Sequence, residues 1–81
     1  MQERSTLADL CPGESCRVTG LTAKGAMRRR LLDIGLVENS RVSCLGKSPA
    51  GDPAAYLICG AVIAIRGTDA RGVQIAEIQW V

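Results

Sequence analysis

Apolar and polar residues alternate along much of the chain, with the period of two that is typical of half-buried β-strands. In the first such segment, Cys16 and Val18 share one side and are flanked by polar residues. Short strands bounded by turn residues predict a β-rich domain. The strands expected from the sequence are residues 14–21, 40–46, 54–59, 61–66 and 73–81.

Residues 24–34 follow a helical period instead. Their apolar stripe repeats at i, i+4 and i+7 and consists of Met27, Leu31 and Ile34. Gly35 is placed to adopt the left-handed conformation that ends a helix, and Leu36 can then pack back on Leu31. The sequence therefore predicts a helix of about three turns that ends at Gly35.

Turn signals separate these elements. Residues 5–10, STLADL, predict a short helical turn with Ser5 or Thr6 as N-cap and with Leu7 and Leu10 facing inward. Proline, glycine and asparagine mark the other connections. The turns and loops expected in this way are Pro12–Gly13, Asn39 and residues 48–53. Residues 67–72 are expected to form a turn or a single helical turn.

Five short strands in so few residues favour a small closed barrel, because closure removes exposed strand edges. An SH3-like barrel with an inserted helix fits this order of elements best, and a small OB-like barrel is the alternative. The chain is 47% apolar with a net charge of +2, so it can form a core and has no general attraction to DNA or anionic lipid. We expect one domain over residues 1–81.

The longest apolar run, residues 54–65, is interrupted by Gly60 and is too short to cross a bilayer as a helix. The first ten residues carry charges where a secretory signal has an apolar core. Both observations predict a soluble cytoplasmic protein without direct membrane insertion.

The four cysteines show no zinc-binding spacing, and a cytoplasmic location favours reduced thiols. Cys44 and Cys59 lie in apolar, strand-like segments. We expect such cysteines to behave as small buried hydrophobic residues.

The sequence lacks the residues that most enzymes use. It has no histidine, its eight carboxylates show no paired spacing, and the 48–53 loop lacks the lysine of a phosphate-binding loop. Tyr56 and Trp80 are the only aromatic residues, so base stacking has little support. We therefore expect no catalytic residues and no nucleic-acid partner.

The run of three arginines does not form a flat basic patch. At about 100° per residue, Arg28, Arg29 and Arg30 point in three different directions around the helix. Arg29 can pair with Asp33 one turn later. Leu32 falls outside the apolar stripe, between Arg28 and Arg29, so it either covers a loop of the same chain or forms the centre of a docking face with an arginine rim.

These segments together resemble the FeoA family of ferrous iron transport proteins. The similarity includes LADLCPGESCRV at 7–18, RRLLDIGL at 29–36, SPAGDP at 48–53 and GAVIAIR at 60–66. Its most specific parts are RRLLDIGL and the tripeptide Gly51-Asp52-Pro53. Asn39 stands where family members often have glycine, and the four cysteines are not part of the family pattern.

The resemblance implies an SH3-like barrel and a cytoplasmic accessory of ferrous iron uptake. Its partner would be the cytosolic part of FeoB, a membrane transporter with a GTPase domain. For this contact we predict the helix face of Arg28, Arg29 and Leu32, together with the loop Gly51, Asp52 and Pro53. Homo-oligomerisation is left open.

An alternative follows from the kinship of this family with the C-terminal domains of iron- and manganese-dependent repressors. It is a sensor or carrier domain that binds a transition metal. We predict no built metal site and no resident cofactor, and we leave weak binding of a divalent ion such as Fe²⁺ open.

Overall fold

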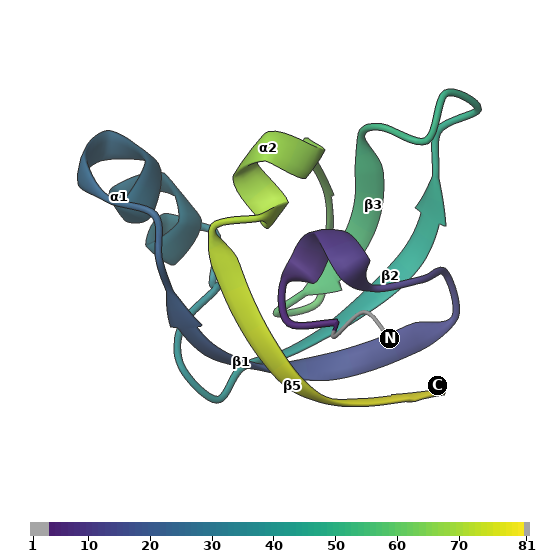
Figure 1. Ribbon diagram of the computed structural model, residues 1–81, viewed down its shortest axis with the longest axis horizontal. Coiled ribbons are helices and arrows are strands. Elements are labelled where there is room, and N and C mark those ends of the chain that lie inside the picture. The colour runs from purple at the N-terminus through teal and green to yellow at the C-terminus, as the bar shows by residue number, and fades with distance from the viewer. Residues whose placement is uncertain (1–3, 81) are drawn as a thin grey trace.

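The computed structural model describes residues 4–80, which form a curved, five-stranded antiparallel sheet with helical segments packed against it (Figure 1). The strands lie in the order β4-β3-β2-β1-β5. In chain order the elements are the 3₁₀ turn η1 (Leu7–Asp9), β1 (Glu14–Leu21), α1 (Gly25–Asp33), β2 (Arg41–Lys47), β3 (Ala54–Ile58), β4 (Ala61–Ile65), α2 (Gly67–Ala70) and β5 (Val73–Trp80).

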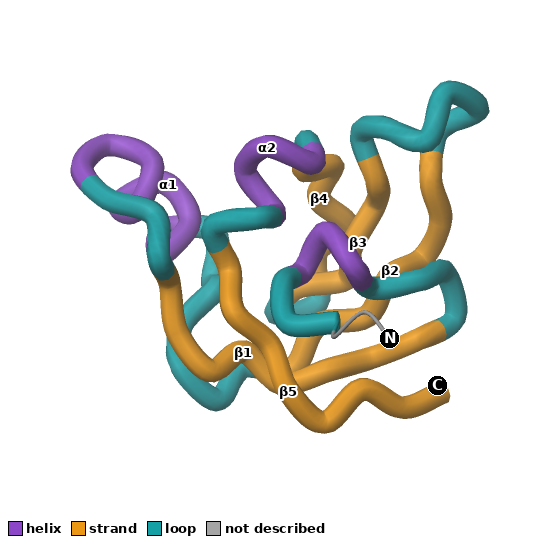
Figure 2. The backbone as a smooth tube through the Cα atoms, viewed as in Figure 1, coloured by secondary structure: helices purple, strands orange, loops and turns teal. Residues whose placement is uncertain are grey.

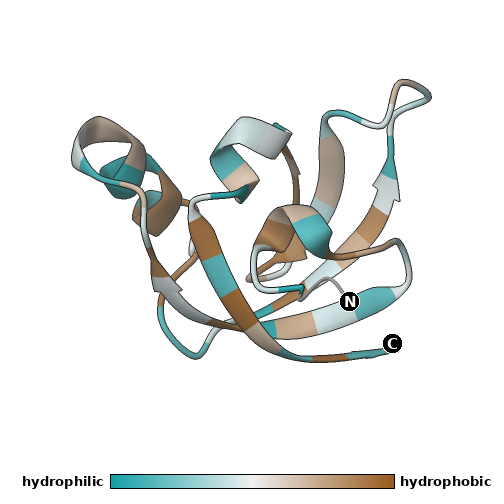
Figure 3. Cartoon of the chain, in the orientation of Figure 1, coloured by the Kyte–Doolittle hydropathy of each residue, from teal (hydrophilic) through white to brown (hydrophobic). Residues whose placement is uncertain are grey.

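The predicted strands are confirmed to within one or two residues at each end. Strand β1 has the predicted bounds, and its side chains Cys16 and Val18 are fully buried. Strand β5 begins with alternating hydrophobic and hydrophilic bands in Figure 3, and it buries Val73 and Ile75 on one side. The prediction for this strand also includes Val81, which lies outside the described residues.

Helix α1 ends as the sequence predicts. Gly35 has φ = +104°, and its N–H donates to Leu32 O at 3.0 Å. The N–H of Leu36 donates to Leu31 O at 3.1 Å, which completes a Schellman ending. Leu31 and Leu36 both join the core, with Met27 and Ile34 packed at its margin. The apolar stripe therefore attaches the helix to the barrel.

The core fills the space between the curved sheet and the short helical segments. Figure 2 shows η1 and α2 over the concave side of the strands. Tyr56 is the largest fully buried residue, and its hydroxyl donates to Leu7 O at 3.3 Å. Burial raises the pKa of Tyr56 to about 12. The buried apolar residues are Leu7, Leu10, Cys16, Val18, Leu31, Leu36, Val42, Cys44, Ala54, Tyr56, Ile58, Ile65, Ala70, Val73 and Ile75.

The N-terminal segment covers one edge of the sheet. Thr6 forms a bridge with Gln74 of β5, and the Ile75 N–H donates to Ser5 O at 3.0 Å. Thr6 is also the N-cap of η1, as predicted, and its N–H donates to an Asp9 carboxylate oxygen at 3.0 Å. The hydrogen bonds from this backbone lower the pKa of Asp9. The N-terminal segment is thus held by hydrogen bonds to β5 and to η1.

The prediction of buried cysteines is confirmed at Cys44 and wrong at Cys59. All four thiols are free; Cys16 and Cys44 are buried, whereas Cys11 and Cys59 are exposed. Desolvation raises the pKa of Cys16 to about 11 and raises that of Cys44. Cys59 is exposed because it occupies a two-residue turn between β3 and β4, with φ = +50° followed by Gly60 at φ = +82°. Apolar neighbours in sequence do not reveal this turn position.

Candidate docking surface

The outer side of α1 forms a shallow hollow on the protein surface. It has a volume of about 540 Å³ and is lined by Gly25, Arg28, Arg29, Leu32 and Asp33. The predicted helix-face residues are thus brought together on one surface. The helix places them there because its apolar stripe is turned toward the core on the opposite side.

Leu32 contributes apolar area to this surface. Its exposed fraction is 37%, whereas that of the preceding Leu31 is 2%. Leu32 is thus partly exposed, and it lines the same hollow as Arg28 and Arg29. An apolar side chain with a charged rim is typical of the centre of a protein-binding surface.

The arginines are exposed on several sides of the helix, as the helical geometry predicts. The predicted pair between Arg29 and Asp33 is not formed. Within residues 4–80, the ion pairs join Arg4 to Glu14 and Arg17 to Glu77 instead. The α1 guanidinium groups therefore have no carboxylate partner within residues 4–80 to release before they bind another protein.

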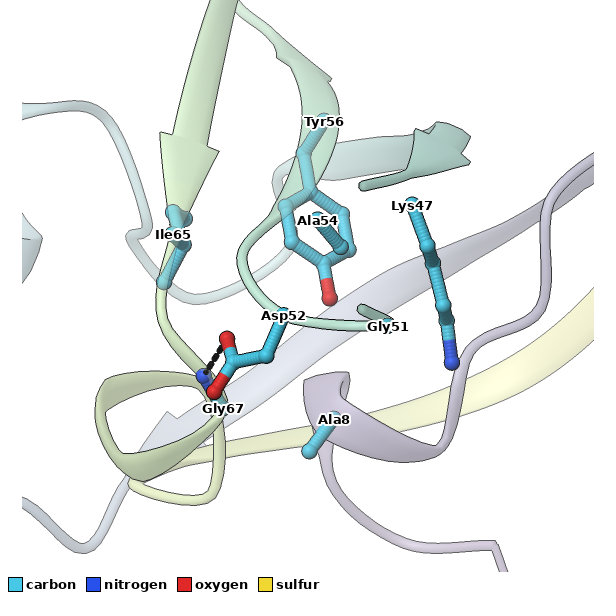
Figure 4. A pocket seen from close by; sticks show the side chains of 8 residues that line it. All are labelled: Ala8, Lys47, Gly51, Asp52, Ala54, Tyr56, Ile65 and Gly67. Carbon is cyan, nitrogen blue, oxygen red and sulfur yellow. Dashed lines mark hydrogen bonds between the residues drawn. The ribbon is translucent and has the colours of Figure 1, made fainter. Parts of the chain in front are cut away.

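The loop Gly51-Asp52-Pro53 connects β2 to β3 and has a structural contact of its own. The Gly67 N–H donates to Asp52 Oδ1 at 2.8 Å, so this carboxylate satisfies a free N–H at the start of α2 (Figure 4). Gly51 has φ = +88°, which favours glycine. The tripeptide thus holds the loop against α2.

A small cavity lies beneath this loop. Figure 4 shows Lys47, Asp52 and Tyr56 around it, and its volume is about 30 Å³. This volume suffices for a water molecule and is far below that of a ligand pocket. The loop is therefore a surface feature and does not enclose a substrate site.

The structure does not unite the helix face with the loop. Figure 1 shows α1 and the β2–β3 loop on opposite sides of α2, and different residues line the hollow on α1 and the cavity at the loop. The molecule measures 29 × 27 × 24 Å along its principal axes. A partner that touches both parts must extend across most of the domain.

Within residues 4–80, no three Cys, Asp or Glu side chains are grouped so that they could hold a metal ion. The buried thiols of Cys16 and Cys44 lie inside the hydrophobic core. No helix in the same range is long and apolar enough to cross a membrane.

Sequence reasoning missed one exposed apolar surface, on the outer face of β2, β3 and β4. Its large side chains are Leu45, Leu57 and Val62, with exposed fractions of 50%, 38% and 66%. The signal was present in the apolar run 54–65, in which both faces of two adjacent strands are apolar. In a single-layer sheet, one of these faces must remain outside the core.

The fold defines the class of protein as a small SH3-like barrel domain. A family model of the FeoA domain matches residues 5–77. The chain therefore belongs to the FeoA family. No curated protein matches the sequence.

Solved FeoA structures support this assignment. A FeoA protein from Chlorobium tepidum is 34% identical, with a TM-score of 0.79 over 86% of this chain and 67% of that chain. FeoA from Stenotrophomonas maltophilia, solved with zinc and described as a prokaryotic SH3 domain protein, is 26% identical; its TM-score is 0.83 over 93% of this chain and 95% of that chain. The predicted SH3-like fold is thus confirmed.

The predicted kinship with metal-dependent repressors is confirmed for the fold alone. A manganese-dependent transcriptional repressor is 18% identical, with a TM-score of 0.80 over 93% of this chain and 42% of that chain.

Proposed function

We propose that this protein is a cytoplasmic accessory of ferrous iron uptake that docks on the cytosolic part of FeoB. Membership of the FeoA family associates the chain with ferrous iron transport. For the relative from Stenotrophomonas maltophilia, a role as a ferrous iron transport activating factor has been suggested. A small barrel without paired catalytic groups fits a binding role better than an enzymatic one.

The observation that carries the proposal is the exposed Leu32 between Arg28 and Arg29. Burying this leucine against a partner removes apolar area from water, and the arginines can pair with carboxylates at the rim. The matching surface on FeoB would hold an apolar pocket bordered by acidic residues. Gly51, Asp52 and Pro53 form a second contact in this proposal, at the far end of the domain.

Titration of the protein against the cytosolic domain of FeoB, with and without guanine nucleotide, tests the docking. We expect Leu32→Glu and Arg29→Glu to weaken binding by at least tenfold, since the first places a charge at the apolar centre and the second reverses a charge at the rim. The matched control is Leu57→Glu, because Leu57 is 38% exposed and lies on another face. Full affinity in a folded Leu32→Glu, Arg29→Glu variant would exclude α1 from the contact.

The contribution of the loop needs a separate variant. Pro53→Ser changes the surface of this loop. A loss of affinity in this variant, at unchanged thermal stability, would support a contact that reaches both ends of the domain. Unchanged affinity would restrict the contact to α1.

Transition-metal binding is the alternative function. The Stenotrophomonas maltophilia relative was solved with zinc, and this chain has exposed thiols at Cys11 and Cys59. Anaerobic calorimetry with Fe²⁺, on the wild type and on a variant with all four cysteines changed to serine, distinguishes the two functions. Heat that disappears in the serine variant would support a metal carrier or sensor.

A further inference from the structure

Strand β4 is an open edge of the sheet, next to β3 alone (Figure 2). The two-residue turn makes Ile58 and Ala61 the first pair of the β3–β4 ladder. In such a hairpin, this pair exchanges both hydrogen bonds, and the bonded pairs then alternate along the strands. The backbone groups of Ala61, Ile63 and Ile65 therefore face β3, and those of Val62 and Ala64 face outward.

These outward groups have no partner among residues 4–80. The backbone hydrogen bonds outside the regular elements include none from Val62 or Ala64. Both residues are exposed, so the edge is open to an approaching strand. Two free residues at i and i+2 offer two N–H donors and two C=O acceptors, as antiparallel strand addition requires.

The side chains on the same strand extend the binding surface. Val62 lies directly opposite Leu57, and Ala64 lies opposite Ala55. Val62, Ala64 and Ala55, together with Leu45 of β2, border a groove of about 470 Å³ on the outer face. Lys47 lies at one end of this groove, and the residues on β3 and β4 that line it are all uncharged.

The other edge of the sheet, at β5, is protected, whereas the edge at β4 is not. On β5, Thr6 pairs with Gln74, and register shifts interrupt the ladder with β1. Natural proteins usually protect edges with charges, prolines, bulges or a covering segment. The β4 sequence Ala61–Ile65, AVIAI, contains no charge and no proline, and its ladder with β3 has no register shift.

We propose that β4 pairs with β4 of a second copy of this chain, around a two-fold axis at Ile63. In this register, Val62 lies opposite Ala64 of the second copy, and the two strands form four backbone hydrogen bonds. The outer faces then join into one apolar surface. The result is an isologous dimer with a continuous sheet across the interface.

Charge and symmetry favour a second copy over a foreign peptide. An occupant must be extended, uncharged and apolar on one face, and it must have free backbone groups at i and i+2. Strand β4 itself meets all of these conditions. The pairing also places Arg66 opposite Gly60 of the second copy, so no like charges meet at the ends of the strands.

Analytical ultracentrifugation tests the dimer with the full chain. We expect a concentration-dependent mass that reaches twice the monomer value at roughly 0.1–1 mM, as for a weak complex. Val62→Lys introduces charge repulsion across the axis, and Ala64→Pro removes an outward N–H without breaking a bond to β3. Both variants should remain monomeric, whereas Leu32→Lys on α1 should dimerise like the wild type.

Disulfide trapping tests the register. In a background with Cys11→Ser and Cys59→Ser, one chain carries Val62→Cys and another carries Ala64→Cys. Opposed residues in the proposed pairing lie about 5.5 Å apart at Cα, within disulfide range, whereas Val62 lies beyond that range from its own copy. The mixture should therefore cross-link under mild oxidation, and neither variant alone should do so.

A wild-type protein that stays monomeric at the highest concentration would overturn the proposal. A dimer that persists in both folded edge variants, or cross-linking of Val62→Cys alone, would do the same. The FeoB titration is independent, because Leu32→Glu and Val62→Lys lie on different surfaces.

Discussion

Helix α1 and the Gly51–Pro53 loop carry the two most specific motifs of the sequence, but they use their polar side chains differently. On α1, Arg28 and Arg29 are exposed and have no carboxylate partner among the described residues. In the loop, the Asp52 carboxylate accepts a hydrogen bond from Gly67. The difference shows that a specific motif can serve an outer surface in one place and the fold itself in another.

The largest difference between a residue of the fold and a residue of the outer surface should appear at two adjacent leucines of α1. Leu31→Ala should lower the free energy of unfolding by about 3 kcal/mol, because it leaves a cavity in the core. Leu32→Ala should lower it by less than about 1 kcal/mol, since this side chain is partly exposed already. Urea denaturation measures both. Equal losses would mean that Leu32 belongs to the core and not to a free docking face.

The next comparison is between Gly35, at the end of α1, and Gly51, in the loop. A Cβ at Gly35 would lie 2.8 Å from Cys59 Sγ and 3.2 Å from Ile58 Cγ2, and the backbone has φ = +104°. Gly35→Ala should therefore cost about 2–3 kcal/mol of stability. At Gly51, φ is +88° and no atom lies within 4 Å of the added Cβ.

Gly51→Ala is thus the matched control for backbone strain alone, and it should cost about 1 kcal/mol. The double variant Gly35→Ala, Cys59→Ala should recover part of the loss, because it removes the overlap with Cys59 Sγ and leaves the backbone strain at residue 35. If the two single alanine variants have the same stability, close packing at Gly35 contributes nothing.

The smallest effect should come from the aspartates. Asp52→Ala should lower stability by about 1 kcal/mol, since it leaves the Gly67 N–H without this partner. Asp52→Asn keeps an oxygen acceptor and should restore most of the loss. Asp33→Ala should change stability by less than about 0.5 kcal/mol, because Asp33 is an exposed residue in the last turn of α1. Thermal unfolding measures the series, and an equal loss in Asp33→Ala would contradict the assigned roles.

Local features of the sequence predicted local structure well. The end of α1 follows from two adjacent residues, Gly35 and Leu36, whose hydrogen bonds return to the helix itself. The contact between Asp52 and Gly67 joins residues fifteen positions apart, and it depends on how the β3–β4 hairpin brings them together. Side-chain chemistry alone does not reveal such a pairing.

The same limit explains the errors at the surface. Cys59 has apolar neighbours, but its exposure depends on the two-residue turn that Gly60 completes. The open edge of β4 depends on strand order, which the alternation of residues does not specify. The directions of the α1 arginines were predictable, because helical geometry relates the direction of each side chain to its position in the sequence.

The two ends of the described chain meet at Glu14. The Arg4 guanidinium donates to its carboxylate at 2.6 Å, and the same residue pairs with Trp80 in the β1–β5 ladder. Because both ends lie at one place on the surface, the domain can be joined to another domain there without disturbing the barrel. A short linker between the ends, with new termini opened in the exposed loop at Ala50–Gly51, should give a circular permutant with the same fold.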